Sequence, residues 1–200
     1  MIDFDALAAT WDDDPVKVER ARVVAAAIVG TVALPPDAAG FEYGCGTGLL
    51  GVALASRFVR LTLADSSEGM LAVLGRKLAD AGLFHVVPLR LDLDVEPPHA
   101  DRFDLVFSSM ALHHVRDVPR VLRAFHELTV PGGAIALADL DAEDGSFHGA
   151  EVDVHHGFDR AALAREVERA GFVEPSFRTV FDIRRDERVY PVFLLVARRP

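Results

Sequence analysis

The amino-acid sequence predicts an α/β fold, in which a mostly parallel sheet is covered by helices on both faces and the last strand runs antiparallel. Three observations predict it. Strand-like apolar runs alternate with segments of helical periodicity. A glycine cluster at 44–48 follows the first of these strands. The chain then closes with two β-rich runs that have no helix between them, so the last run must reverse direction.

Length, composition and charge limit the classes of protein to consider. The chain has 200 residues, half of them apolar, and 21 Lys and Arg against 31 Asp and Glu give a formal charge of −10. This size suits a single domain with one core. The acidic balance argues against a nucleic-acid partner, and segment 139–153 has six acids and no Lys or Arg. The single cysteine excludes a disulfide framework and a zinc–thiolate cluster.

Two further features concern localisation. The longest charge-free apolar run, Val23 to Leu34, is shorter than the about 20 residues that a membrane-spanning helix needs. The start, Met1 to Asp5, is acidic where a signal peptide would be basic. We therefore expect a soluble, cytoplasmic protein without a membrane partner. The sequence does not indicate an oligomeric state.

The first half of the chain contains three predicted helices and three predicted strands. Pro35-Pro36 ends the first helix, Ser66 or Ser67 caps the third, and Gly82 follows its last turn. The predicted strands are 38–43, 59–64 and 85–91, and the first two predicted helices are 15–34 and 48–58.

The second half continues the alternation and then departs from it. A strand at 103–108 has the continuous apolar character of a strand buried on both faces. A turn at 131–133 is expected to lead into the next strand, and Asp159 caps the last helix. The remaining predicted elements are a helix at 117–129, a strand at 134–138, an acidic, histidine-bearing loop at 140–157, and a hairpin of 177–183 with 188–197.

The strongest functional motif is the run Phe41 to Gly48 (FEYGCGTG) after the first strand. Glycines there let the backbone turn sharply and approach a ligand, and the free N–H groups of the following helix favour an anionic group. Asp65 ends the second strand about 20 residues later, where a carboxylate can accept hydrogen bonds from both ribose hydroxyls. The two features predict a nucleotide-like ligand and leave NAD and S-adenosylmethionine both open.

Three features distinguish these cofactors. Glu42 lies two residues before the first glycine, where an acid would repel a pyrophosphate but could join the hydrogen bonds around an α-amino group. Asp92 follows the third strand, where it could accept from an adenine amino group. The chain also ends soon after the fifth strand, which leaves little room for the second catalytic segment of a dehydrogenase.

At this point the sequence resembles the class I S-adenosylmethionine-dependent methyltransferases, most of all the small-molecule branch similar to quinone-biosynthesis enzymes. The segments EYGCGTG, LADSSEGML, LDLD, FDLVFSSMALHHV and PGGAIALADL follow one another in that family's order across roughly residues 36–198. The resemblance implies a Rossmann-like three-layer sandwich with seven strands. It divides the single domain into a helical cap (1–35), a cofactor-binding core (36–139), and a substrate-side loop, helix and hairpin (140–200).

The resemblance also implies a role for particular residues. Glu42 would lie near the methionine amino group, Asp65 would hold the ribose, and Asp92 with Leu93 would meet the adenine. Cys45 is expected to be a small side chain tolerated in the tight turn rather than a nucleophile. The other implied cofactor residues are the loop glycines Gly44, Gly46 and Gly48, the adenosine-flanking Ser66 and Met70, and Ser108, Ser109 and Met110 at the sulfonium end.

The sequence says less about the residues that would contact the methyl acceptor. His113 and His114 follow the fourth strand at the carboxyl edge of the sheet, and one of them is expected to contact the acceptor or act as a base. Histidines and acids of the 140–157 loop do not match a dedicated metal-binding spacing, so no metal site is predicted. Trp11 is either a lid over the cofactor or an anchor for the first helix.

Three functions remain open. A methyltransferase acting by in-line displacement on a small molecule leads, because no Asn-Pro-Pro-Tyr-like run or Pro-Cys pair follows the fourth strand, and the chain has no basic patch for RNA. A non-catalytic module that binds S-adenosylmethionine or S-adenosylhomocysteine is the second. An NAD-dependent oxidoreductase is the third.

Overall fold

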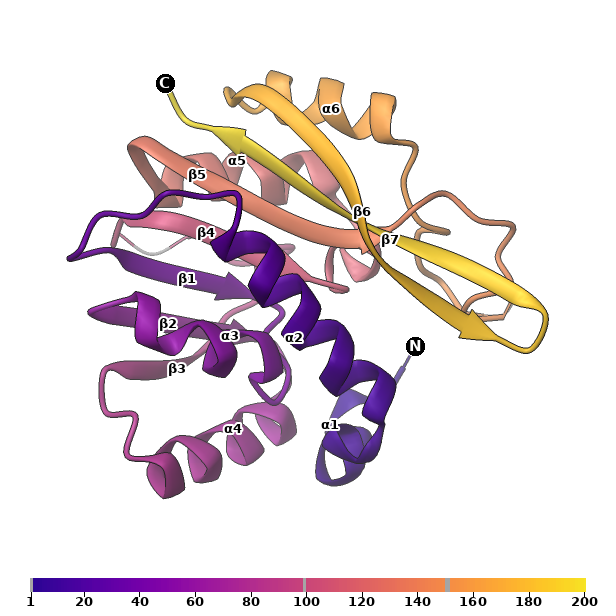
Figure 1. The fold of residues 1–200 in the computed structure, drawn as a ribbon, viewed down its shortest axis with the longest axis horizontal. Helices are drawn as coiled ribbons and strands as arrows, with labels where there is room; N and C mark the ends of the chain where they lie inside the picture. The colour runs from indigo at the N-terminus through magenta and orange to yellow at the C-terminus, as the bar shows by residue number, and fades with distance from the viewer. Residues whose placement is uncertain (1, 99, 150–151) are drawn as a thin grey trace.

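The chain forms one seven-stranded sheet with helices on both faces, as the computed structural model shows for residues 2–98, 100–149 and 152–200 (Figure 1). The strand order is β3-β2-β1-β4-β5-β7-β6. The first five strands in this order are parallel, and β7 is antiparallel to both of its neighbours. The predicted fold class is confirmed. The strands are β1 (Ala39–Tyr43), β2 (Arg60–Asp65), β3 (Val86–Arg90), β4 (Phe103–Ser109), β5 (Thr129–Leu140), β6 (Val173–Arg185) and β7 (Arg188–Arg198).

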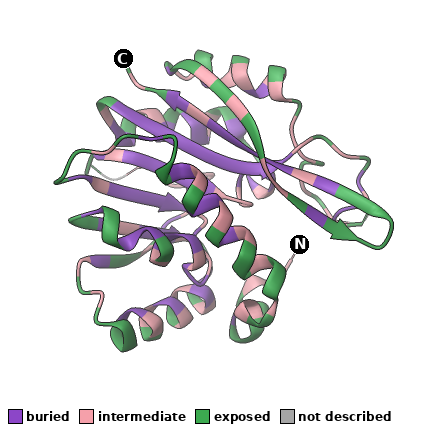
Figure 2. Cartoon of the chain, in the orientation of Figure 1, coloured by how far each residue is buried: buried purple, intermediate pink, exposed green. Residues whose placement is uncertain are grey.

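Two apolar clusters form the core, one on each face of the sheet. The helices α2, α3 and α4 contribute to the first cluster, and α5 and α6 contribute to the second. Figure 2 shows the resulting buried band along β4, β5 and β7, with exposed residues on the outer faces of the helices. The helices are α1 (Phe4–Leu7), α2 (Pro15–Val29), α3 (Leu49–Leu54), α4 (Glu68–Ala81), α5 (Val118–Leu128) and α6 (Arg160–Arg169), with short 3-10 helices at Ala8–Asp13, Ala55–Arg57 and Leu112–His114.

The structure differs from the sequence prediction at several element ends. Helix α2 stops at Val29, five residues before the expected end, because Gly30 caps it and the Thr31 hydroxyl donates to the Ala27 carbonyl. The expected turn at 131–133 is wrong. Strand β5 continues through these residues, and its pairing with β4 shifts register there, so Gly132 (φ +80°) makes a bulge inside one long strand.

The crossover from β3 to β4 is the one parallel connection in which the described residues form no helix. The segment after β3 is instead held against the start of α5. The Asp94 carboxylate accepts from the backbone N–H groups of Arg116 and Asp117, both at 3.0 Å, and the Arg120 guanidinium donates to the Leu93 carbonyl at 2.9 Å. These contacts fix the chain that follows β3 at the carboxyl edge of the sheet.

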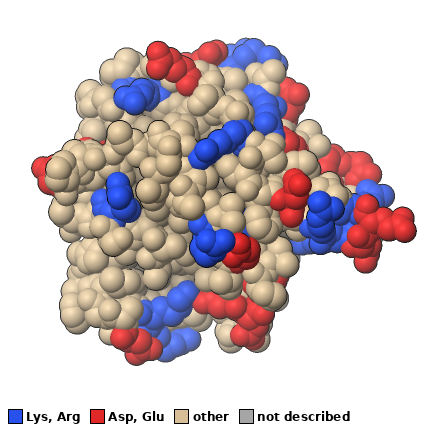
Figure 3. Space-filling model, in the orientation of Figure 1, with Lys and Arg blue, Asp and Glu red and all other residues tan. Residues whose placement is uncertain are grey.

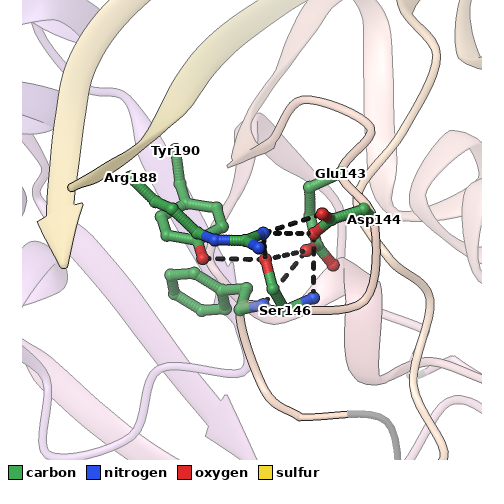
Figure 4. Close-up of polar contacts among 6 residues, drawn as sticks. Glu143, Asp144, Ser146, Arg188 and Tyr190 are labelled. Atoms are coloured by element: carbon green, nitrogen blue, oxygen red, sulfur yellow. Dashed lines mark hydrogen bonds and ion pairs between the residues drawn. The ribbon is translucent and has the colours of Figure 1, made fainter. Parts of the chain in front are cut away.

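The loop between β5 and α6 is tied to the β6–β7 hairpin (Figure 4). The Arg188 guanidinium donates to both carboxylate oxygens of Asp144, at 2.9 and 2.7 Å, and to the Ser146 hydroxyl at 2.6 Å. The Ser146 hydroxyl also lies 2.8 Å from the hydroxyl of the buried Tyr190. One of the six acids of segment 139–153, Glu151, lies outside the described residues.

Charged residues of both signs are interspersed on the face shown in Figure 3, where Lys and Arg lie beside Asp and Glu around a largely uncharged centre. Within the described ranges, no helix combines the length and apolar character that crossing a membrane requires.

Candidate active site

The glycine loop follows β1 and turns back beneath the carboxyl edge of the sheet. Gly44 has φ +67°, and a side chain there would meet the Cβ of Ala111 at 2.2 Å. Gly48 begins α3 in the left-handed region (φ +81°), with Leu74 2.5 Å from where its Cβ would be. Both positions therefore require glycine for conformation and for space. At Gly46 (φ +54°) an added Cβ would make ordinary contacts with Trp11 at 3.7 Å and Met70 at 3.9 Å, so conformation rather than space favours glycine there.

Asp65 lies at the end of β2 and holds the glycine loop in place. One carboxylate oxygen accepts from the Gly46 N–H at 2.7 Å, and the other accepts from the Ser67 N–H at 2.9 Å. Burial raises the pKa of Asp65, while these backbone donors favour its ionised form. The carboxylate thus joins the loop to the first turn of α4, where Ser67 is the N-cap.

Glu42 is the least satisfied buried group among the described residues. Its side chain belongs to β1 and is 2% exposed, and its Oε2 atom has no hydrogen-bond partner. Burial first, and then the charge of Asp65, raise the pKa of this carboxyl well above its usual range. A buried carboxylate oxygen without a donor is costly, so a bound cationic group beside it would be stabilised.

Hydrogen bonds join the carboxyl end of β1 to the segment after β3 and to β4. The Tyr43 hydroxyl accepts from the Leu93 N–H at 3.3 Å, and the Ser108 hydroxyl donates to the Tyr43 carbonyl at 2.8 Å. Asp92 accepts from the Asp94 N–H at 3.0 Å in a local turn. The strand ends that carry the predicted site residues therefore meet at one edge.

A cavity of about 950 Å³ lies at this edge of the sheet. Eleven of the predicted site residues border it: Glu42, Gly44, Cys45, Gly46, Asp65, Ser66, Met70, Asp92, Ser109, Met110 and His114. Four other predicted site residues are buried behind the cavity wall and do not line it: Gly48, Leu93, Ser108 and His113. Burial raises the pKa of the Cys45 thiol well above its usual range, so the thiol stays protonated and is a poor nucleophile.

The backbone after β4 reaches the cavity in a strained conformation. Met110 has φ +56°, which is rare for a residue with a side chain, and its N–H donates to the Ala138 carbonyl at 2.8 Å. This turn places Met110 on the cavity wall and is followed by the two adjacent histidines.

His113 and His114 differ sharply in their surroundings. His113 is 1% exposed, and its Nδ1 atom lies 2.6 Å from the buried carboxylate of Asp139. His114 borders the cavity, and Phe4 packs edge-on against its ring with 5.2 Å between ring centroids. Burial lowers the pKa of His114 to about 3, so its ring is neutral at physiological pH.

The 140–157 loop brings a third histidine to this pair. The Nε2 atoms of His113 and His148 are 2.9 Å apart, and burial lowers the pKa of His148 to about 4. The pKa of Asp139 is lowered because hydrogen bonds from His113 and from backbone N–H groups outweigh its burial. The sequence places His148 only in a polar loop, and its separation of 35 residues from His113 gives no pattern that would join them.

The N-terminal segment (residues 2–14) also covers the cavity, which the sequence left undecided. Asp5 accepts from the Ser67 hydroxyl at 2.6 Å, and Asp12 accepts from the Thr47 hydroxyl at 2.5 Å and from Lys77 at 2.7 Å. Trp11 borders the cavity, as a lid residue would. Further lining residues that the sequence analysis missed are Ile2, Asp3, Phe4, Lys17 and Arg20.

The fold and this cavity define an α/β protein with a nucleotide-type cofactor site at the carboxyl edge of its sheet. Residues 41–133 match the family described as "Methyltransferase domain". This match covers just under half of the chain, and over that segment the chain is similar to the class I S-adenosylmethionine-dependent methyltransferases.

Individual relatives agree with this assignment. The chain is 29% identical to an uncharacterized methyltransferase of Schizosaccharomyces pombe over 147 residues (70% of this chain, 50% of that protein). It is 28% identical to a ubiquinone biosynthesis O-methyltransferase of Pseudomonas syringae over 141 residues (69% and 61%). The chain thus spans half to three-fifths of the length of these two relatives.

Among solved structures, a chain from the Haloferax volcanii complex of the Trm112 methyltransferase activator with a methyltransferase superposes with a TM-score of 0.80. The identity is 20%, and the match covers 100% of this chain and 99% of that one, so this likeness shows the fold. The comparisons do not favour the oxidoreductase alternative.

Proposed function

We propose that the protein transfers the methyl group of S-adenosylmethionine to a small organic acceptor bound in the same cavity. The observation that carries this proposal is Glu42, a buried carboxylate with an unpartnered oxygen on the wall of a cavity beside the glycine loop. An amino-acid ammonium group would supply the missing donor and favour the ionised carboxylate, whereas a pyrophosphate would supply no donor. The family match supports the same cofactor.

The residues present fit this cofactor over its whole length. Glu42 would accept from the amino group, and the cations Lys17 and Arg20, which border the cavity, suit the carboxylate of the methionine part. Asp65 would accept from the ribose, and Asp92 would accept from the adenine amino group. The glycine loop, with Cys45, would lie against the methionine part, and Ser66 and Met70 would flank the adenosine. Met110 would lie at the sulfonium end. Leu93 and Ser108 would not touch the cofactor and would act by holding the backbone of the site.

The bound cofactor supplies an electrophilic methyl group on a positively charged sulfur, so the protein needs mainly to align the acceptor and exclude water. Met110 and His114 border the cavity beyond the glycine loop, and the N-terminal segment closes over it. His114, neutral at physiological pH, offers a hydrogen-bonding ring to an acceptor hydroxyl or amine, and its pKa of about 3 makes it a poor base for taking the proton. The buried His113 would position its neighbours rather than touch the acceptor.

Calorimetric titration tests the cofactor part of the proposal. We expect S-adenosylhomocysteine to bind with one site per chain and NADH not to bind; the reverse result would overturn the proposal. Release of S-adenosylhomocysteine across a panel of metabolites with O, N, C and S acceptors then tests catalysis. Cofactor binding without release on any acceptor would instead support the non-catalytic binding module.

A further inference from the structure

The histidine cluster (His113, His114 and His148) has the arrangement of a metal site. One ring nitrogen from each residue lies within 4.8 Å of the others. His113 is buried, and the other two are partly exposed, so an ion could reach the cluster from outside. The proposed methyl transfer needs only one of these side chains at the cavity, and it gives no reason for three imidazoles to converge.

Asp139 adds a second, independent feature. Its carboxylate lies 2.6 Å from His113 Nδ1, so an Nδ1 N–H would donate to the carboxylate and leave Nε2, which faces His148, as the ligand atom. A histidine that binds a metal commonly donates its other N–H to a carboxylate in this way, which fixes the tautomer and makes the ligand more basic. The buried negative charge of Asp139 would also offset part of the charge of the ion.

The position of His148 is fixed by its neighbours. Phe147 packs edge-on against the His148 ring with centroids 4.8 Å apart, and the Arg185 guanidinium lies 3.9 Å from the centre of the Phe147 ring. The contacts of Asp144 and Ser146 with Arg188 hold the preceding turn against the hairpin (Figure 4). His148 is thus held by side chains from β6 and β7, as a ligand on an otherwise irregular loop needs to be.

From this geometry we propose that His113, His114 and His148 bind one zinc ion or a similar transition-metal ion, with Asp139 orienting His113. Three imidazole ligands suit zinc, cobalt or nickel, whereas magnesium prefers oxygen. Three protein ligands leave a fourth position for water or for another small ligand. Because His114 also borders the cavity, the ion would lie beside the proposed acceptor space.

The test uses the full chain without a histidine tag, stripped of metal and free of S-adenosylmethionine. Titration with Zn²⁺, followed by calorimetry, and with Co²⁺, followed by visible absorption, should show one ion per chain. His148→Ala should weaken Zn²⁺ binding at least about tenfold, and Asp139→Asn by about 10–100-fold, the usual effect of losing an orienting partner. His148 lies on a partly exposed loop, so its variant should fold; circular dichroism checks this.

His155→Ala is the matched control, because His155 is an exposed histidine of the same loop outside the cluster. It should bind Zn²⁺ as the wild type does. The proposal fails if the wild type takes up no stoichiometric Zn²⁺ or Co²⁺, or if His148→Ala binds them as tightly as the wild type. S-adenosylhomocysteine binding is measured separately on the metal-free protein. Failure of the metal proposal therefore leaves the proposed function untouched, and failure of cofactor binding leaves the metal proposal untouched.

Discussion

Replacing Glu42 by Gln tests whether the ligand-free site contains a buried carboxyl that resists ionisation. Burial and Asp65 raise the pKa of Glu42 in the folded protein well above 4.5, the value expected in the unfolded chain. The stability that such a group contributes is fully present below its unfolded pKa and is lost as the pH rises toward its folded pKa. Glutamine does not titrate, so Glu42→Gln should gain stability relative to the wild type as the pH rises.

The size of this stability difference follows from the one proton that Glu42 holds in the folded protein and loses in the unfolded chain. A full proton difference between the folded and unfolded states changes stability by about 1.4 kcal/mol per pH unit. For a chain of this length about 1 kcal/mol shifts the unfolding temperature by roughly 2–4 °C, so the gap should widen by about 3–6 °C per pH unit from about pH 5 up to the folded pKa. Asp65 is present in both proteins, so its own raised pKa largely cancels in the comparison.

Thermal unfolding of the ligand-free proteins from about pH 5 to about pH 7 measures this gap. Glu127→Gln, which alters an exposed carboxyl on α5, serves as the control and should follow the wild type. Parallel curves for Glu42→Gln and the wild type would refute the reasoning. The same variant should bind S-adenosylhomocysteine about 1.5–3 kcal/mol more weakly, because the ammonium group loses its negatively charged partner and keeps only a neutral amide oxygen. Unchanged affinity would remove Glu42 from the amino-group role.

Three other predictions concern the surroundings of this site. Gly51→Ala would place a methyl group 2.4 Å from the Glu42 carboxylate. In denaturant unfolding it should destabilise the protein by about 1–3 kcal/mol. The control, Gly75→Ala on the open side of α4, should stabilise the protein by up to about 1 kcal/mol. If Gly51→Ala leaves the free energy of unfolding unchanged, the packing described around the Glu42 carboxylate is wrong. Asp65→Asn should weaken S-adenosylhomocysteine binding by about 1.5–3 kcal/mol, and an unchanged dissociation constant would contradict the ribose assignment. Lys77→Met removes the ion pair that joins Asp12 of the N-terminal segment to α4, so chymotrypsin should cleave that segment faster than in the wild type. Equal rates would show that other contacts hold the segment in place.

The cofactor half of the site could be predicted because its determinants are local. A glycine loop after a strand, and acids at the ends of the next two strands, are each visible within a few residues of sequence. The parallel order of the strands then brings Glu42, Asp65 and Asp92 to one edge. What the sequence did not indicate is that Glu42 would be left without a donor, since that depends on the packing of Gly51 and Leu63 around it.

The N-terminal segment shows why long-range contacts escape such predictions. Asp5 and Asp12 belong to an acidic start whose partners the sequence does not indicate. In the structure they accept hydrogen bonds from Ser67 and Thr47, 62 and 35 residues away. Nothing in the spacing of short helices specifies these partners. The turn expected at 131–133 failed for a related reason, because Thr129 and Ala134 pair with β4 on either side of it and the glycines between them exchange backbone hydrogen bonds with the distant Arg199.

The acceptor half depends almost wholly on such long-range contacts, and this has a functional consequence. His148 reaches His113 from a loop that Arg188, on a hairpin 40 residues further along, holds together with Arg185. A change in that loop or hairpin can therefore reshape the acceptor side while the glycine loop and strand ends stay intact. Related chains can then share a cofactor site and differ in acceptor, since different parts of the chain determine the two. The loop and hairpin, rather than the glycine loop, are where substitutions should alter acceptor preference without altering cofactor affinity.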